Sequence, residues 1–370
     1  MQFTLTHKRL LNLLFISISG GKCDTALFCS MTQNEWKDLL FLSRLQGISA
    51  IAFEALDYLP ANCRPPKDIL IEWLGVSISI ESHYNKHLQL ANELARLWAR
   101  NGLRTMVFKG LAHSRYYTIP SHREFGDFDC FLFKTDPEQN NNEISAFCKG
   151  NALARDFGAD VYDGWYKHSK INFKGLSVEN HQYFTATRSS KNAKKLNAYM
   201  TASLCDGSHL DKLIDTEILL PPLELEGLFM LYHSQMHFLV EGISLRHYVD
   251  WAFWIRSNQS HIDWESFSKR CKEFGLYHFV VVLNAIVEKY FGVVLKDNIE
   301  RDSTFSEKVI LSALLEDAPI CSKNKGRWYE RFRLISNAFK YSWKFRDVVH
   351  YSRWEYLWNY IWGFLLKEED

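Results

Sequence analysis

The chain has 370 residues, of which 47% are hydrophobic, 15% aromatic and 24% charged, and its formal net charge is +1. The length predicts two domains or one domain with a large appendage, and the apolar and aromatic content excludes a disordered chain. The balanced charge argues against a protein that mainly coats nucleic acid, since such binding depends on an excess of Lys and Arg.

Eight cysteines are scattered along the chain without a C-x-x-C pair, which favours reduced, mostly buried thiols in a cytoplasmic protein. The apolar run from Leu10 to Gly20 lacks the cleavage site of a signal peptide, and we interpret it as part of an amphipathic first helix. No stretch has the roughly 18 to 20 uninterrupted apolar residues of a membrane span, so we expect no integral membrane segment.

Residues 1–102 have a helical pattern. Thr32 precedes a helix with an apolar face, and a long helix after Pro65-Pro66 carries apolar residues at helical spacing. Asn101-Gly102 is a typical C-terminal stop for that helix. We therefore predict an N-terminal helical region over 1–102.

Residues 103–186 are predicted to form a small unit of strands and helices. The expected elements are a strand at 105–108, a helix at 111–117, a strand at 127–133, a helix at about 137–149, and two hairpin strands at 170–173 and 176–181. Lys174-Gly175 supplies the tight turn between the last two strands.

The rest of the chain divides at Pro221-Pro222. Residues 187–222 show no regular period and are interpreted as an irregular connector, whereas residues 223–370 are interpreted as a C-terminal helical domain. Its expected helices are 223–240, 244–256, 264–274, 276–290 and 306–315. The predicted fold class is therefore α+β, with a small mixed sheet core flanked by N-terminal and C-terminal helical regions.

Residues 323–353 contain nine Lys and Arg against two acids, with aromatic side chains interleaved. This composition is typical of a nucleic-acid groove or of an interfacial helix on anionic lipid. It is equally typical of an amphipathic helix that buries its rings and keeps its charges in water. A weak anionic partner at 323–353 and a packing role both remain as interpretations.

Asp127 and Asp129 carry the strongest chemical signal. Because side chains alternate across a strand, both carboxylates point to one face, about 7 Å apart along it. Two such carboxylates repel each other and resist burial unless a cation lies between them. Mg²⁺ combines a few carboxylate oxygens with phosphate and water, so the pair predicts a site for Mg²⁺ (or Mn²⁺).

Two further segments supply candidates near this pair. Lys109-Gly110 joins a strand to a helix whose first N–H groups are suited to phosphate. Glu179 and His181 share one face of a later strand, so Glu179 becomes a third carboxylate if the hairpin packs beside the Asp strand. Three acids beside a glycine turn fit metal-assisted transfer of a phosphate-bearing group.

These motifs together resemble an uncharacterised nucleotidyltransferase family of the polymerase-β-like superfamily, over about residues 103–256. The matching segments are Val107-Phe108-Lys109-Gly110, Tyr116 or Tyr117, Pro120, Arg123, Gly126-Asp127-Phe128-Asp129, Val178-Glu179-Asn180-His181, and the helical residues His233, His237, Leu245-Arg246 and Asp250-Trp251. The resemblance implies a nucleotidyltransferase-like core. It also implies transfer of a nucleoside monophosphate from an NTP, ATP among the candidates, to an unidentified acceptor hydroxyl with release of pyrophosphate.

Carried over by position, the resemblance implies catalytic and metal-binding roles for Asp127, Asp129 and Glu179. It implies that Glu179 also helps to deprotonate the acceptor hydroxyl. The residues expected to contact the nucleotide are Lys109, Gly110, Ser114 and Arg123. His181 is a possible supporting residue that orients Glu179, with a hydrogen-bonded structural role as the alternative. Lys109 and Arg123 have the alternative of forming structural ion pairs with neighbouring acids.

The glycine turn departs from the wider superfamily at one position. Many of its members have Gly-Ser or Gly-Gly there, whereas Gly110-Leu111 offers no hydroxyl, and Ser114 follows one helical turn later. An alternative function is therefore a catalytically inactive nucleotide-binding or regulatory module. A further alternative is an RNA- or membrane-associated factor that acts through the basic aromatic C-terminal region.

Overall fold

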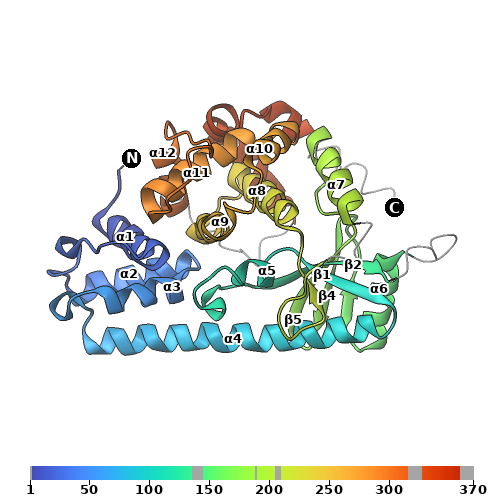
Figure 1. The fold of residues 1–370 in the computed structure, drawn as a ribbon, viewed down its shortest axis with the longest axis horizontal. Coiled ribbons are helices and arrows are strands. Elements are labelled where there is room, and N and C mark those ends of the chain that lie inside the picture. Colours follow the sequence, from blue (N-terminus) through green and yellow to red (C-terminus); the bar gives the residue numbers. More distant parts are fainter. Residues whose placement is uncertain (1, 136–144, 188–189, 205–209, 316–326, 359–370) are drawn as a thin grey trace. The chain divides into compact units, whose positions relative to one another are not determined.

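The computed structural model describes residues 2–135, 145–187, 190–204, 210–315 and 327–358, with the side chains of 327–332 left out. The contacts divide the chain into two compact units (Figure 1). Residues 82–229 form the first, which holds the sheet, and residues 2–81 with 230–358 form the second, which is helical. The predicted α+β class is confirmed, although α4 and α8 each run through a boundary between the units.

The sheet has six strands in the order β3-β4-β5-β2-β1-β6. They are β1 Leu103–Val107, β2 Asp127–Lys134, β3 Asp160–Tyr162, β4 His168–Phe173, β5 Leu176–His181 and β6 Ile218–Leu219. β2 runs parallel to β5 and antiparallel to β1, β1 runs parallel to β6, and the β3-β4-β5 pairs are antiparallel. The central pairing of β2 with β5 places the Asp strand beside the strand that carries Glu179.

Alternation along β2 separates a core face from a polar face. Phe128, Cys130 and Leu132 are buried in an apolar core with residues of α4 (Lys67–Ala99) and α6 (Ala146–Asp156). Asp129 lies between them in the sequence, so its side chain points to the opposite face of the sheet. The core therefore occupies one face, and the polar residues are left on the other.

The predicted hairpin is confirmed as β4 and β5. Lys174 and Gly175 both have positive φ, 53° and 88°, as a two-residue type I′ connection requires. Asn172 supports the turn, because its Oδ1 accepts a hydrogen bond of 3.0 Å from the Gly175 N–H. The resulting register pairs His168 with His181 across the two strands.

Three predicted elements differ in the structure. The prediction of an irregular connector over 187–222 was wrong, because this segment contains α7 (Lys191–Leu204) and β6. The helix expected at about 137–149 is α6, Ala146–Asp156, and 136–144 lie outside the described residues. The helix expected at 111–117 is only α5, Leu111–Ser114, so little helix dipole stands behind its N-terminus.

The helical unit is built from amphipathic segments. Its helices are α1 Leu5–Ser19, α2 Gln33–Leu45, α3 Ser49–Glu54, the first part of α4, the later part of α8 (Leu223–Val240), α9 Leu245–Asn258, α10 Trp264–Glu273, α11 Tyr277–Phe291, α12 Ser306–Leu315 and α13 Arg327–Lys340. Leu10, Leu13 and Leu14 are fully buried in α1, which packs against α11, so the predicted first helix is confirmed. Among the described residues, no helix combines the length and apolar character that crossing a bilayer requires.

The basic aromatic segment 323–353 is described only in part. Lys344 lies in a π-helical turn and is fully buried, with its Nζ 4.7 Å from the ring centre of Phe238 and 4.4 Å from that of Tyr341. This cation–π packing supports a structural role for Lys344. Trp354, which directly follows the segment, is by contrast 66% exposed. An anionic partner at 323–353 stays a prediction.

The cysteines differ from the expected set of reduced, buried thiols. Cys29 and Cys63 form a disulfide in the helical unit. Cys130 and Cys271 are free and buried, whereas Cys148 is free and exposed. The remaining free cysteine of the described chain is the half-buried Cys23, and 205 and 321 lie outside the described residues. The disulfide removes the cysteine-based argument for a cytoplasmic location.

Removing this disulfide is expected to destabilise the helical unit. The bonded cysteines are 34 residues apart, and opening a loop of that length raises the entropy of the unfolded chain enough to cost about 3–4 kcal/mol. Thermal unfolding of Cys63→Ser should therefore occur well below that of the wild type, and reductant should lower only the wild-type midpoint. Cys148→Ser is the control and should unfold like the wild type. Equal midpoints for wild type and Cys63→Ser would contradict a stabilising bond.

Candidate active site

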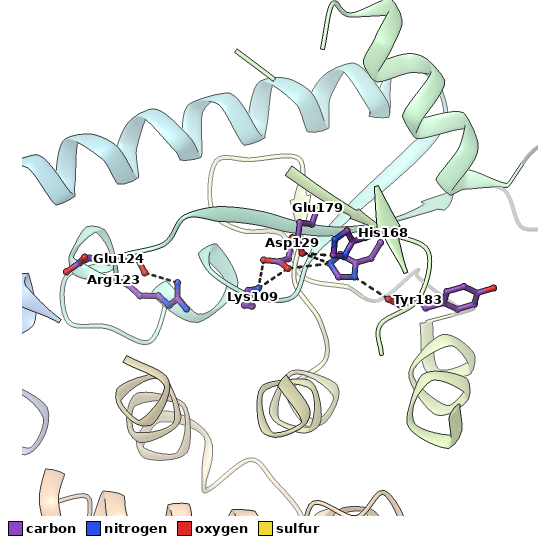
Figure 2. A network of polar contacts seen from close by, with 8 residues as sticks. Lys109, Arg123, Glu124, Asp129, His168, Glu179 and Tyr183 are labelled. Atoms are coloured by element: carbon purple, nitrogen blue, oxygen red, sulfur yellow. Dashed lines mark hydrogen bonds and ion pairs between the residues drawn. The ribbon is translucent and has the colours of Figure 1, made fainter. Parts of the chain in front are cut away.

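Polar side chains gather on the sheet face opposite the apolar core (Figure 2). Asp129 on β2 and Glu179 on β5 are direct partners in the parallel register, so their side chains lie next to each other on one face. His181 follows two residues after Glu179, and His168 faces it from β4. Lys109, just after β1, completes the cluster. The structure thus brings together four of the predicted site residues and adds His168.

Asp129 is the most deeply buried acid of the cluster, with 2% exposure. Lys109 Nζ lies 2.9 Å from each of its carboxylate oxygens, and His181 Nε2 lies 3.3 Å from Oδ1. Burial raises the pKa of the Asp129 carboxyl, but the charge of Lys109 and the contact with His181 outweigh burial and hold this pKa well below its usual range. Asp129 is therefore ionised at neutral pH.

Glu179 lies between the two histidines. Its Oε2 is 3.5 Å from His181 Nε2 and 3.5 Å from His168 Nδ1. Burial and the charge of Asp129 raise the pKa of Glu179, but the hydrogen bond with His181 outweighs them and brings this pKa below the usual value. Burial lowers the pKa of His168 to about 3, so its imidazole is neutral at pH 7.

Asp127 and Gly110 lie close together at the start of β2. Asp127 is the exposed first residue of β2, on the same face as Asp129. Gly110 has φ 63° and ψ −102°, a conformation that favours glycine, and a Cβ at this position would lie 3.6 Å from the backbone oxygen of Asp127. The glycine turn therefore runs directly beside the start of the Asp strand.

Ser114 and Arg123 are not part of the carboxylate cluster. Ser114 Oγ donates to the Leu111 carbonyl at 2.8 Å and lies 2.8 Å from Tyr84 Oη, which is left as the donor of that second bond. Arg123 is buried, and its Nη1 donates to the Glu124 carbonyl at 3.3 Å, apart from Asp129 in Figure 2. Nucleotide contacts by these two residues stay predictions.

A second buried acid fixes the segment that follows the glycine turn. Glu226 of α8 is fully buried, and its Oε2 accepts hydrogen bonds from Arg115 Nη2 at 2.8 Å and Tyr116 Oη at 2.7 Å. This gives Tyr116 of the motif a positioning role. Sequence reasoning missed Glu226, because an acid in the first turn of a helix is ordinarily solvent-exposed.

His168 is the functional candidate that the sequence analysis did not name. Its signal was present in the hairpin register, which pairs position 168 with 181 once the turn at Lys174 and Gly175 is fixed. The predicted strand began two residues later, at Lys170, so the prediction did not include His168, the cross-strand partner of His181.

Comparison with known protein families matches residues 32–292 to the family described as uncharacterised nucleotidyltransferase. The match covers well over half of the chain and includes the whole sheet together with the cluster around Asp129. No curated protein and no solved structure gives a significant match. The chain belongs to the uncharacterised nucleotidyltransferase family and is, at the level of that family, a transferase enzyme.

Proposed function

We propose that the chain transfers a nucleoside monophosphate from an NTP to an acceptor hydroxyl and releases pyrophosphate. Asp127, Asp129 and Glu179 hold the divalent metal ions, Mg²⁺ or Mn²⁺. The observation that carries the proposal is the direct pairing of Asp129 with Glu179 on neighbouring parallel strands, with Asp127 on the same face.

The donor set fits a divalent cation. Carboxylates on one face repel one another. The Asp129 carboxylate lies within 3.3 Å of two basic groups, Lys109 Nζ and His181 Nε2, which shows that the site favours positive charge. Metal ions bound by such carboxylates neutralise charge on the phosphates and on the attacking and leaving oxygens.

The other side chains take distinct parts in this scheme. Glu179, beside Asp129 and partly exposed, accepts the proton of the acceptor hydroxyl. Gly110, which lacks a Cβ, lets phosphate approach the backbone beside Asp127. The Lys109 side chain is partly exposed, so its Nζ can leave Asp129 and bind a phosphate oxygen instead.

Removing the metal tests this function. The purified full chain is incubated with NTPs labelled at the α-phosphate and with pools of sugars, small metabolites, proteins and RNA as acceptors. We expect label on one acceptor class and an equal amount of pyrophosphate with Mg²⁺ or Mn²⁺, and background levels with excess chelator. Transfer that continues at the same rate in chelator would contradict the proposed metal dependence.

A second candidate function is nucleotide binding without turnover. It is favoured by the glycine turn, since Leu111 carries no hydroxyl and the Ser114 hydroxyl is already bonded to Leu111 and Tyr84. NTP binding in calorimetry, with no transfer to any acceptor pool, would favour this candidate over the enzyme.

A further inference from the structure

His168 and Glu179 lie next to each other on the polar sheet face (Figure 2), and His181 lies close to both. One potential ligand atom from each of these three side chains lies within 4.8 Å of the other two. His168 is only 5% exposed, and within the described chain its Nδ1 makes no hydrogen bond, although it lies 3.5 Å from Glu179 Oε2. A buried ring nitrogen thus points at a carboxylate without a satisfactory partner.

The contacts of His181 direct its Nε2 at the same carboxylate. Its Nδ1 lies 3.2 Å from the Tyr183 carbonyl, which can only accept, so Nδ1 carries the hydrogen. Nε2 then faces Asp129 Oδ1 at 3.3 Å and Glu179 Oε2 at 3.5 Å. A lone pair on Nε2 would be repelled by both carboxylates, so a proton or a metal ion has to lie between them. A ring N–H held by a carbonyl, which leaves the other nitrogen to face the ion, is the usual orientation of a metal-binding histidine.

We propose that His168, Glu179 and His181 bind a first-row transition-metal dication of the Zn²⁺, Co²⁺ or Mn²⁺ type, even without nucleotide. Two imidazole nitrogens and one carboxylate favour such ions, whereas Mg²⁺ prefers oxygen ligands alone. Three protein ligands also leave coordination positions open. The inference rests on the proposed function in that it uses the same Glu179, and it implies that a metal position at Glu179 selects against Mg²⁺, whereas Asp127 and Asp129 accept it.

The test uses Co²⁺ as the probe, with the full-length chain free of nucleotide. Titration is followed by visible absorption, and the loaded protein is examined by proton NMR for hyperfine-shifted imidazole N–H resonances. We expect one tightly bound Co²⁺ that excess Mg²⁺ does not displace, with two shifted imidazole signals. His168→Gln and His181→Gln should each weaken binding by about tenfold or more and each remove one signal.

The control variant is His237→Gln, which alters a second histidine cluster made by His233, His237 and His247. It should bind Co²⁺ like the wild type. The proposal is overturned if wild-type protein shows no shifted imidazole signals, if Mg²⁺ displaces Co²⁺, or if the His168 variant binds as well as the wild type. If a variant fails to fold, wild-type protein without shifted imidazole signals, or with Co²⁺ that Mg²⁺ displaces, still overturns the proposal.

Failure of this inference is distinguishable from failure of the proposed function. Mg²⁺-dependent transfer by protein that shows no imidazole-bound Co²⁺ would overturn the histidine site alone. Imidazole-bound Co²⁺ in a protein that transfers no nucleotide to any acceptor would leave the metal site standing and overturn the enzyme.

Discussion

Asp129→Asn is expected to lower the rate of nucleotidyl transfer at least about a thousandfold, which corresponds to about 4 kcal/mol of activation free energy. Asparagine keeps the shape of the side chain but removes the negative charge that, under the proposed function, holds a metal ion. The rate is measured with labelled NTP at saturating Mg²⁺, at a temperature where circular dichroism shows the variant to be folded.

The stability of this variant needs a separate measurement, because Asp129 is also an ion-pair partner. Loss of a fully buried pair costs about 3–5 kcal/mol, but the Lys109 side chain is 24% exposed and can turn to water, so we expect a smaller loss of about 2 kcal/mol. Asp160→Asn, an exposed acid at the start of β3, is the matched control and should change neither quantity. Transfer that persists in folded Asp129→Asn protein would refute the role of this carboxylate.

The second large expected effect is a pH dependence of stability that arises from His168. Its pKa is about 3 in the folded protein against 6.5 when unconstrained, so between these values only the unfolded chain binds the proton. The free energy of unfolding is therefore expected to fall as the pH drops below 6.5, by up to about 1.4 kcal/mol per pH unit from this group. The contribution is fully present above pH 6.5.

His168→Gln isolates this contribution. Denaturant unfolding of wild type and variant is compared from pH 7 to pH 5, with chelator present. Histidines outside the cluster are common to both proteins, and the pKa of Glu179 lies below its ordinary value of 4.5 and therefore below this range. We expect the wild type to lose about 2 kcal/mol more than the variant by pH 5. Parallel pH profiles would show that His168 is not held neutral by burial.

Much of the sheet unit could be predicted from the sequence because its signals are local. Alternating apolar residues mark β2, and the Lys174-Gly175 turn fixes the hairpin that places Glu179 and His181 on one face. The pairing of β2 with β5 could only be assumed from the sequence, since strand order is set by long-range packing. The structure supplies that order, and with it the pairing of Asp129 and Glu179.

The elements that sequence reasoning missed have their own physical reasons. Helix α7 buries Ala193, Leu196 and Met200 along one face, but the lysines between them suggested a solvated loop. Tertiary packing outweighed that impression. The partners of Lys109 and Ser114 were equally beyond reach, because a neighbouring strand and helix α4 provide them.

Under the proposed function, the face bearing Asp127, Asp129 and Glu179 is a metal-dependent nucleotidyl-transfer site. The most direct measurement is a crystal structure of the chain with a non-hydrolysable NTP and Mg²⁺. We expect the triphosphate beside Gly110, with Mg²⁺ bound to Asp127 and Asp129 and with Lys109 no longer paired with Asp129. Nucleotide bound elsewhere, with the Lys109–Asp129 ion pair intact, would refute the proposed site.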